Sequence, residues 1–402
     1  MTTDDDPFLA VRDGARHRAL AELAARGPVH HLRLATGTDA WVVTGYAEAK
    51  AVLTDPRVIR EGASNSPYGE EMPAALYSAL NSHMLTTDPP AHTRLRRLVS
   101  AAFTRRRVEE LAPRIERICA ELLDEMAEAL DADGEVDLID AFAAPLPITV
   151  ICELLGVPRE SHGDVRGWAG PLLAGRFVGY EVFSRAAEEF VDFLHALLAD
   201  KRRQPADDLL SALVEVRDGG DRLSEDELTS MVHLLLLAGH ETTVNLIANG
   251  MNALLAHPGR LALLRAEPDR LPAAVEELLR FDPPAQVPIP AITAEPIEVA
   301  GQQIPAGENI VVALLAVNRD PARFADPGVL DLTRDDGGHL AFGHGVHHCL
   351  GAPLARLEAR IALGALLDRF GDLTLAVPAD SLERLPSLII NRLAVLPVRR
   401  AG

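Results

Sequence analysis

Apolar residues recur at intervals of three and four along much of this chain, a spacing that predicts a mainly helical protein. We expect amphipathic helices over residues 15–25, 108–130 and 147–155. Alternating and β-rich segments at 29–34 and 40–44 predict a small sheet near the N-terminus. Residues 60–80 carry Gly, Ser, Asn and Pro between scattered apolar residues, which predicts a long loop.

The longest helical run follows Ser224 and ends near His257, so we expect a helix over about 224–257. Ser224 and Glu227 have the spacing of a capping box, which marks a helix start. At about 1.5 Å per residue this helix would span on the order of 50 Å. Its middle, LLLLAGHETTVNL, is apolar on nearly every face and then polar, so we expect a buried helix with a reactive patch. Gly239 favours a local widening of that helix.

Beyond Pro284 the pattern changes to strands at 287–292, 297–299 and 309–313, with a turn at 304–307. These segments predict a second small sheet. The C-terminal stretch PSLIINRLAVLPVRR alternates as a hairpin does. Just before this β-rich region, Glu277 and Arg280 stand one helical turn apart, a pairing that many exposed helices also contain.

Composition narrows the classes of function. A chain of 402 residues with 48% hydrophobic content can bury a large core, and its length alone would permit two or three domains. A net charge of −20 argues against a general binder of nucleic acid or anionic membranes. The start, MTTDDDPF, lacks the features of a secretory signal, and charged or polar residues interrupt the longest apolar runs. We therefore expect a soluble, cytoplasmic protein.

The most specific motif surrounds Cys349. The stretch AFGHGVHHCLGAPLAR, residues 341–356, contains the pattern F-G-x-G-x-H-x-C-x-G and then an apolar series with helical spacing from Leu350. A helix N-terminus favours thiolate over thiol. Cys119 and Cys152 are too distant in sequence to suggest a cluster. A lone thiolate is a poor zinc or iron–sulfur site, whereas haem iron needs one protein ligand. The alternative is a buried structural cysteine beside an ordinary helix-entry loop.

This segment resembles the haem-ligand loop of the cytochrome P-450 monooxygenases. The resemblance covers nearly the whole chain and implies a mainly α protein, a single cytochrome P-450 domain over residues 1–402 with small β-sheets. It further implies that haem b (iron protoporphyrin IX) is bound through the Cys349 thiolate as the metal ligand. The residues that it places at the haem are Leu85, His92, Arg96, Phe103, Ala238, Gly239, Thr242, Ala341, Phe342, Gly343, His347, Cys349 and Gly351.

The resemblance also implies roles for several of these residues. His92, Arg96 and His347 would hold the haem propionates, and Phe342 would shield the sulfur. The pattern A-G-x-E-T over 238–242 is similar to the family's oxygen-activation site, so Glu241 and Thr242 are the predicted catalytic residues that manage protons. A zinc-protease reading of His240-Glu241 fails, because the fifth position of H-E-x-x-H is Val244.

Two positions depart from the family pattern. Glu277 and Arg280 correspond to a buried structural pair of the family. Ala291 stands where the family usually has a propionate-binding Arg, and Val329 stands where it has an Arg that joins this pair. We expect Arg323 or Arg334 to substitute for the second of these.

The resemblance implies a monooxygenase that hydroxylates or epoxidises a bulky lipophilic molecule with dioxygen. The predicted substrate contacts are Met84, Val287, Ile289 and Ile390. We expect a macrolide or another polyketide as the substrate, because the overall sequence pattern is similar to that of actinobacterial enzymes of secondary metabolism. A terpenoid or steroid is the alternative, as is a haem-binding protein without oxygen turnover or a haem-free helical ligand-binding protein.

Electrons are expected from NAD(P)H through a ferredoxin reductase and a ferredoxin. We expect arginines near the thiolate face to attract that acidic partner, and the candidates are Arg94, Arg97, Arg105, Arg106 and Arg107. The enzyme is expected to act as a monomer, without nucleic acid or membrane partners.

Overall fold

The computed structural model describes residues 6–34, 36–63, 68–216, 221–335 and 337–401. The chain divides into two compact units. Unit 1 consists of residues 1–58, 112–146 and 242–402, and unit 2 consists of residues 59–111 and 147–241. A single domain over the whole chain stays a prediction.

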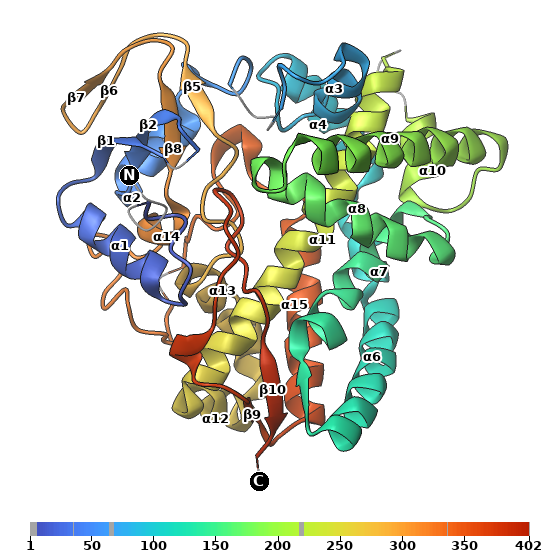
Figure 1. Cartoon of the computed structure of the whole chain (residues 1–402), viewed down its shortest axis with the longest axis vertical. Coiled ribbons are helices and arrows are strands. Elements are labelled where there is room, and N and C mark those ends of the chain that lie inside the picture. The colour runs from blue at the N-terminus through green and yellow to red at the C-terminus, as the bar shows by residue number, and fades with distance from the viewer. Residues whose placement is uncertain (1–5, 35, 64–67, 217–220, 336, 402) are drawn as a thin grey trace. The chain divides into compact units, whose positions relative to one another are not determined.

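The described residues are mainly helical (Figure 1). The helices are α1 (Ala15–Ala24), α2 (Tyr46–Thr54), α3 (Ala74–Asn81), α4 (Ala91–Ala102), α5 (Arg105–Glu110), α6 (Ala112–Asp133), α7 (Pro145–Leu155), α8 (His162–Ala174), α9 (Tyr180–Arg203), α10 (Leu209–Glu215), α11 (Glu225–Ala256), α12 (Pro258–Ala266), α13 (Leu271–Phe281), α14 (Leu314–Val317) and α15 (Ala352–Arg369). The strands are β1 (Val29–Arg33), β2 (Asp39–Val43), β3 (Val58–Ile59), β4 (Glu135–Asp137), β5 (Ala291–Thr293), β6 (Ile297–Val299), β7 (Gln302–Ile304), β8 (Asn309–Val312), β9 (Leu373–Leu375) and β10 (Pro397–Arg400).

Two helix predictions need correction. The helix predicted over 108–130 is two helices, α5 and α6, which meet at Leu111. Pro113 stands in the first turn of α6 and lacks the N–H that would continue the α5 hydrogen-bond pattern. The loop predicted over 60–80 contains α3, which buries Leu76 and Leu80. Residues 64–67 of that predicted loop lie outside the described residues.

The strands assemble differently from the prediction of two separate small sheets. One five-stranded sheet has the order β1-β2-β8-β5-β3, so strands from after Arg280 join those from the N-terminal region. β2 and β8 pair in parallel, with Val43 opposite Val312. β5 is shorter than predicted, because Pro288 and Pro290 precede it and cannot donate backbone hydrogen bonds. Only β6 and β7 form a separate two-stranded sheet there.

Both faces of this sheet are buried. Val42 and Val311 pack into a cluster that includes residues of α1, whereas Val43 and Val312 pack into another that includes residues of α2. Near-continuous burial of neighbouring strand residues explains why their sequence alternates so weakly. The C-terminal β10 pairs with β4 and β9 in a second sheet of unit 1.

The long helix α11 begins as the sequence predicts. The Ser224 N–H donates to Glu227 Oε2 at 2.8 Å, and the Glu227 N–H donates to Ser224 Oγ at 3.2 Å, which closes the capping box. Among the described residues α11 is the one helix with the length and hydropathy to cross a membrane, but 67% of its most apolar window is buried within the protein. Such burial is typical of a core helix.

Candidate functional site

The three cysteines differ in their surroundings. Cys119 and Cys152 are buried, and burial raises the pKa of each thiol to about 12. Cys349 is exposed, although it lies in a structured loop. Its N–H donates to the carbonyl of Phe342 at 2.9 Å, which closes the loop on itself. The helix that follows, α15, begins at Ala352 rather than at Leu350 as predicted, so the cysteine stands just before the first turn.

Two glycines set the path of the cysteine loop, residues 339–351. Gly343 and Gly345 have φ angles of +72° and +74°, in the left-handed region that favours glycine. Gly345 also lies directly against the end of α2. A Cβ there would stand 2.6 Å from the carbonyl oxygen of Leu53, too close for any other residue without movement of the backbone.

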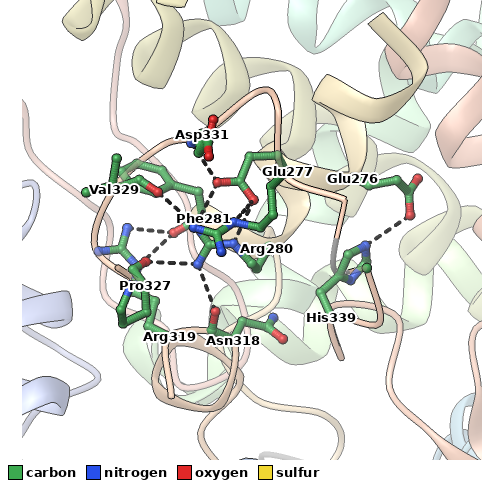
Figure 2. A network of polar contacts seen from close by, with 12 residues as sticks. Glu276, Glu277, Arg280, Phe281, Asn318, Arg319, Pro327, Val329, Asp331 and His339 are labelled. Carbon is green, nitrogen blue, oxygen red and sulfur yellow. Dashed lines mark hydrogen bonds and ion pairs between the residues drawn. The ribbon is translucent and has the colours of Figure 1, made fainter. Parts of the chain in front are cut away.

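Phe342 is held in place by neighbours that the sequence did not suggest. The Arg356 guanidinium lies 4.5 Å from the centroid of the Phe342 ring. Glu276 accepts from Arg356 Nε at 2.7 Å and from Arg356 Nη2 at 2.8 Å. His339 Nε2 lies 3.1 Å from the same carboxylate (Figure 2). Glu276, Arg356 and His339 therefore connect α13, α15 and the cysteine loop.

These partners lower the pKa of the Glu276 carboxyl group. Burial alone raises its pKa, but the hydrogen bonds and charges of Arg356 and His339 outweigh burial and bring the pKa to about 2. The only sequence signal was the spacing of Arg356, which follows Cys349 by two helical turns. Nothing in the sequence marked Glu276 as a site residue, apart from its position next to Glu277.

Glu277 and Arg280 form a buried ion pair in which Arg280 donates to both carboxylate oxygens, each at 2.7 Å. The rest of the guanidinium donates to three backbone carbonyls, those of Asn318, Pro327 and Val329, at 2.9–3.0 Å (Figure 2). A fully satisfied pair of this kind joins α13 to the segment that precedes the cysteine loop. Its role in the structure is to fix that segment.

Arg334, and not Arg323, joins the pair. Arg334 Nε lies 3.2 Å from Glu277 Oε2, and this side chain is largely buried. Arg323 instead stacks on Tyr46 and Phe324. Val329, at the position where the resemblance predicted an arginine, contributes only its carbonyl oxygen. The third residue of this group, its second arginine, therefore comes from a position five residues after Val329.

In unit 2, α4 carries His92 and Arg96. His92 is 2% exposed and Arg96 is partly buried. Burial lowers the pKa of His92, as does the charge of Arg96, while Asp88 opposes that shift. Asp88 fixes this region, because its Oδ2 accepts from the backbone N–H groups of Arg60 and Glu61, both at 2.8 Å.

The middle of α11 contains an unusual exposed position. Ala238 is exposed, whereas Leu236 and Leu237 before it are buried. Gly239 is closely packed, because a Cβ there would stand 3.0 Å from two side-chain atoms of Ile151. α11 is α-helical throughout this stretch, so the predicted widening at Gly239 does not appear as a π-helical turn.

The polar patch of α11 follows directly. His240 Nδ1 lies 2.6 Å from the carbonyl oxygen of Leu236, and since that oxygen can only accept, Nδ1 carries the proton. His240 Nε2 lies 3.9 Å from Glu241 Oε2, and both residues are buried. Thr242, partly buried, follows on the same helix.

The remaining predicted residues divide between the units. Leu85, Phe103 and Met84 belong to unit 2, where Met84 is buried and the other two are partly buried. The predicted residues of unit 1 are Thr242, Glu277, Arg280, Val287, Ile289, Ala341, Phe342, Gly343, His347, Cys349, Gly351 and Ile390. Val287 is fully buried in the core cluster on one face of the sheet, and Ile390 forms a bridge to Ala285.

Four of the predicted partner-binding arginines lie beside carboxylates. Arg94 contacts Glu227 and lies 3.3 Å from Asp221. The other three pairs are Arg105–Glu109 and Arg106–Glu110, both at 2.7 Å, and Arg107–Asp207 at 3.6 Å. The Arg94 pairs are only partly exposed, whereas Arg105 and Arg106 are highly exposed. The positive field of this region is therefore weaker than the sequence suggests.

The side chains of Cys349, His92 and Arg96 have the chemistry that a haem requires of its protein partners. Within the described residues no group of three or more His, Cys, Asp or Glu side chains could hold a bare metal ion. A single exposed thiol could bind a metal that brings its other ligands with it. His92 and Arg96 are the donor types that carboxylates prefer, and the small side chain of Ala238 is exposed on α11.

Comparisons with known proteins agree with this fit. A family model described as Cytochrome P450 matches residues 179–387. Cytochrome P450 107B1 of Saccharopolyspora erythraea is 47% identical, with 99% of each chain covered. The 6-deoxyerythronolide B hydroxylase of the same organism is 47% identical, with 96% of each chain covered. The solved structure of the Bacillus subtilis bacillaene polyketide synthase cytochrome P450 PksS has a TM-score of 0.88 and 38% identity, covering 96% of this chain and 97% of that one.

Proposed function

The chain belongs to the cytochrome P450 family, and from that premise we propose that this monooxygenase hydroxylates or epoxidises a bulky lipophilic molecule of the polyketide class. The family implies haem iron, dioxygen and a small-molecule substrate. The observation that carries the proposal is Cys349, an exposed thiol in a loop with two glycines at positive φ that packs against the end of α2.

The polyketide assignment is supported by what the relatives are. One is a hydroxylase of 6-deoxyerythronolide B, and another belongs to a polyketide synthase of Bacillus subtilis. We propose that four apolar residues contact the substrate, namely Met84, Val287, Ile289 and Ile390. The comparisons favour this class over a terpenoid or a steroid.

We propose that the Cys349 thiolate would bind the haem iron. When bound, the haem supplies an iron centre at which one oxygen atom of dioxygen is activated for insertion into the substrate. His92, Arg96 and His347 would bind the haem carboxylates through charge-assisted hydrogen bonds. The aromatic ring of Phe342, fixed by Arg356, would keep water from the sulfur.

Glu241 and Thr242 are the proposed proton-handling residues. Glu241 is a buried carboxyl beside the imidazole of His240, and Thr242 supplies a hydroxyl on the next position of α11. A carboxyl group and a hydroxyl can pass protons between themselves and ordered water, as general acid catalysis requires.

We further propose that NAD(P)H supplies the electrons through a ferredoxin reductase and a ferredoxin. The exposed side chains of Arg97, Arg105 and Arg106 would attract the acidic ferredoxin, even though Glu109 and Glu110 offset part of their charge. A soluble, cytoplasmic monomer is the form in which we propose that the enzyme works.

The test of this function has two steps. Polyketide lactones, terpenoids and steroids are first screened for a shift of the haem from low to high spin, and each binder is then incubated with NADPH, ferredoxin and reductase under ¹⁸O₂. We expect a polyketide product that contains one ¹⁸O atom. Turnover confined to terpenoids or steroids would contradict the substrate assignment, and products without ¹⁸O would contradict monooxygenation.

Thr242→Ala tests the proton-handling role, with Thr243→Ala as the matched control on the buried face of the same turn. We expect Thr242→Ala to keep its haem but to divert NADPH to hydrogen peroxide, because one proton donor is missing. Thr243→Ala should form product as efficiently as the wild type. Undiminished product per NADPH in Thr242→Ala would remove Thr242 from the mechanism.

A further inference from the structure

We propose that Arg60 is an additional haem-binding residue, which donates to a haem carboxylate beside His92 and Arg96. This inference rests on the proposed haem-binding function and adds to it a residue that no motif in the sequence marked. The four residues from which it is argued, Arg60, Asp88, His92 and Arg96, all belong to unit 2.

Arg60 is an unusual arginine for its position. It follows directly after the short strand β3, yet only 7% of its surface is exposed. Burial lowers the pKa of Arg60, and the neighbouring Asp88 opposes that shift, so the guanidinium remains a cation at neutral pH. Buried arginines are retained where a planar anion can be bound by several N–H groups at once.

Asp88 holds Arg60 and α4 in one arrangement. Its Oδ2 accepts from the backbone N–H groups of Arg60 and Glu61, both at 2.8 Å. Its carbonyl oxygen accepts from the N–H of His92 at 2.9 Å, in the first turn of α4. One residue therefore fixes the turn that carries Arg60 and the helix that carries His92 and Arg96. The charge of Asp88 acts on both Arg60 and His92.

The chemistry of this cluster matches the two carboxylates of haem b. Guanidinium and imidazole groups are donors, and the two positive charges of Arg60 and Arg96 outnumber the one negative charge of Asp88, which favours the approach of a further anion. A guanidinium can bind a carboxylate through two parallel hydrogen bonds, which a lysine cannot reproduce. Ala291, at the position where a propionate-binding arginine was expected, is buried and offers no side-chain donor. The chain therefore has one arginine fewer than the family pattern, and Arg60 provides a cation within unit 2.

The test compares Arg60→Gln and Arg60→Lys with the control Arg57→Gln. Arg57 stands three residues earlier, is 43% exposed and pairs with Asp55. The measured quantity is the rate at which the oxidised holoenzyme transfers haem to excess apomyoglobin. Loss of a charge-assisted hydrogen bond should accelerate transfer about tenfold or more in Arg60→Gln. Arg60→Lys should be intermediate, and Arg57→Gln should match the wild type.

A second readout separates haem binding from a purely structural role. Removal of a cation close to the haem carboxylates disfavours the added electron, so the reduction potential of Arg60→Gln should shift to a more negative value. Urea unfolding of the haem-free proteins measures the structural contribution of Arg60 beside Asp88. A structural role alone would lower that stability but leave both the transfer rate and the potential unchanged, and this result would overturn the proposal.

If Arg60→Gln does not fold, Arg60→Lys decides, because it keeps the charge beside Asp88. Haem transfer from Arg60→Lys at the wild-type rate would then overturn the proposal, and faster transfer would support it. The outcome is distinct from failure of the proposed function. A wild-type protein that binds no haem would refute that function, whereas a wild type that binds haem, with unchanged Arg60 variants, would refute only the role of Arg60.

Discussion

Substitution of Gly345 by alanine should displace the cysteine loop. An alanine at φ +74° costs about 1–2 kcal/mol, because L-residues avoid the left-handed region. The new Cβ would also stand 2.6 Å from the carbonyl oxygen of Leu53 and 3.2 Å from Thr54 Cγ2. The carbonyl belongs to the backbone of α2, so it cannot move as a flexible side chain would. Overpacking of this kind costs roughly 1–3 kcal/mol more.

Gly343→Ala is the matched control for this prediction. Gly343 has nearly the same φ angle, +72°, but a Cβ there would meet its nearest neighbour, the His347 carbonyl oxygen, at 3.9 Å. This variant should therefore show only the conformational cost, about 1–2 kcal/mol. Gly345→Ala should lose about 2–5 kcal/mol in all.

Urea unfolding of the haem-free proteins measures both losses, and haem content after purification measures the consequence for the loop. Because a strained loop moves Cys349, we expect a smaller fraction of thiolate-ligated haem in Gly345→Ala than in Gly343→Ala. Equal losses of stability in the two variants would show that the contact with α2 does not constrain the loop, and would refute the reasoning.

Three further predictions follow from buried groups and exposed charges. Burial lowers the pKa of His83 to about 4, so the unfolded state binds its proton first and stability falls as pH drops from about 6.5 towards 4. His83→Phe should reduce this decrease in the free energy of unfolding by up to about 3 kcal/mol, as measured by urea unfolding at a series of pH values. An unchanged dependence of the free energy of unfolding on pH would contradict this prediction. Arg334→Met should lower the free energy of unfolding by roughly 1–3 kcal/mol, because Glu277 loses a charged partner. Arg323→Met should lower it less, and equal decreases in melting temperature for the two variants would contradict this prediction. Stopped-flow reduction by ferredoxin should slow as ionic strength rises, and a rate insensitive to salt would remove the exposed arginines such as Arg105 from docking.

Features that depend on neighbours in sequence were predictable. The capping box of Ser224 and Glu227 exists as predicted, because both hydrogen bonds form within one helical turn. The buried pair of Glu277 and Arg280 is also one turn long. The cysteine loop was recognisable because its glycines and Cys349 stand in one short segment. Periodicity likewise indicated the long helix, which is found at Glu225–Ala256.

Features that depend on distant segments were not predictable. Nothing in the sequence of β8 indicates that it pairs with β2, which lies more than 250 positions earlier. The spacing of Arg356 from Cys349 was visible, but its partner Glu276 lies on another helix. The choice of Arg334 over Arg323 depends on how the chain folds back towards Glu277. Such contacts depend on tertiary packing, which local patterns do not encode.

The most direct test of the account is the absorption spectrum of the purified protein, reduced under carbon monoxide. Coordination by the Cys349 thiolate predicts a strongly red-shifted Soret band, which Cys349→Ala should lose. A band at the position typical of histidine-ligated haem would contradict ligation by the Cys349 thiolate, and a protein that binds no haem would contradict the proposed function as a whole.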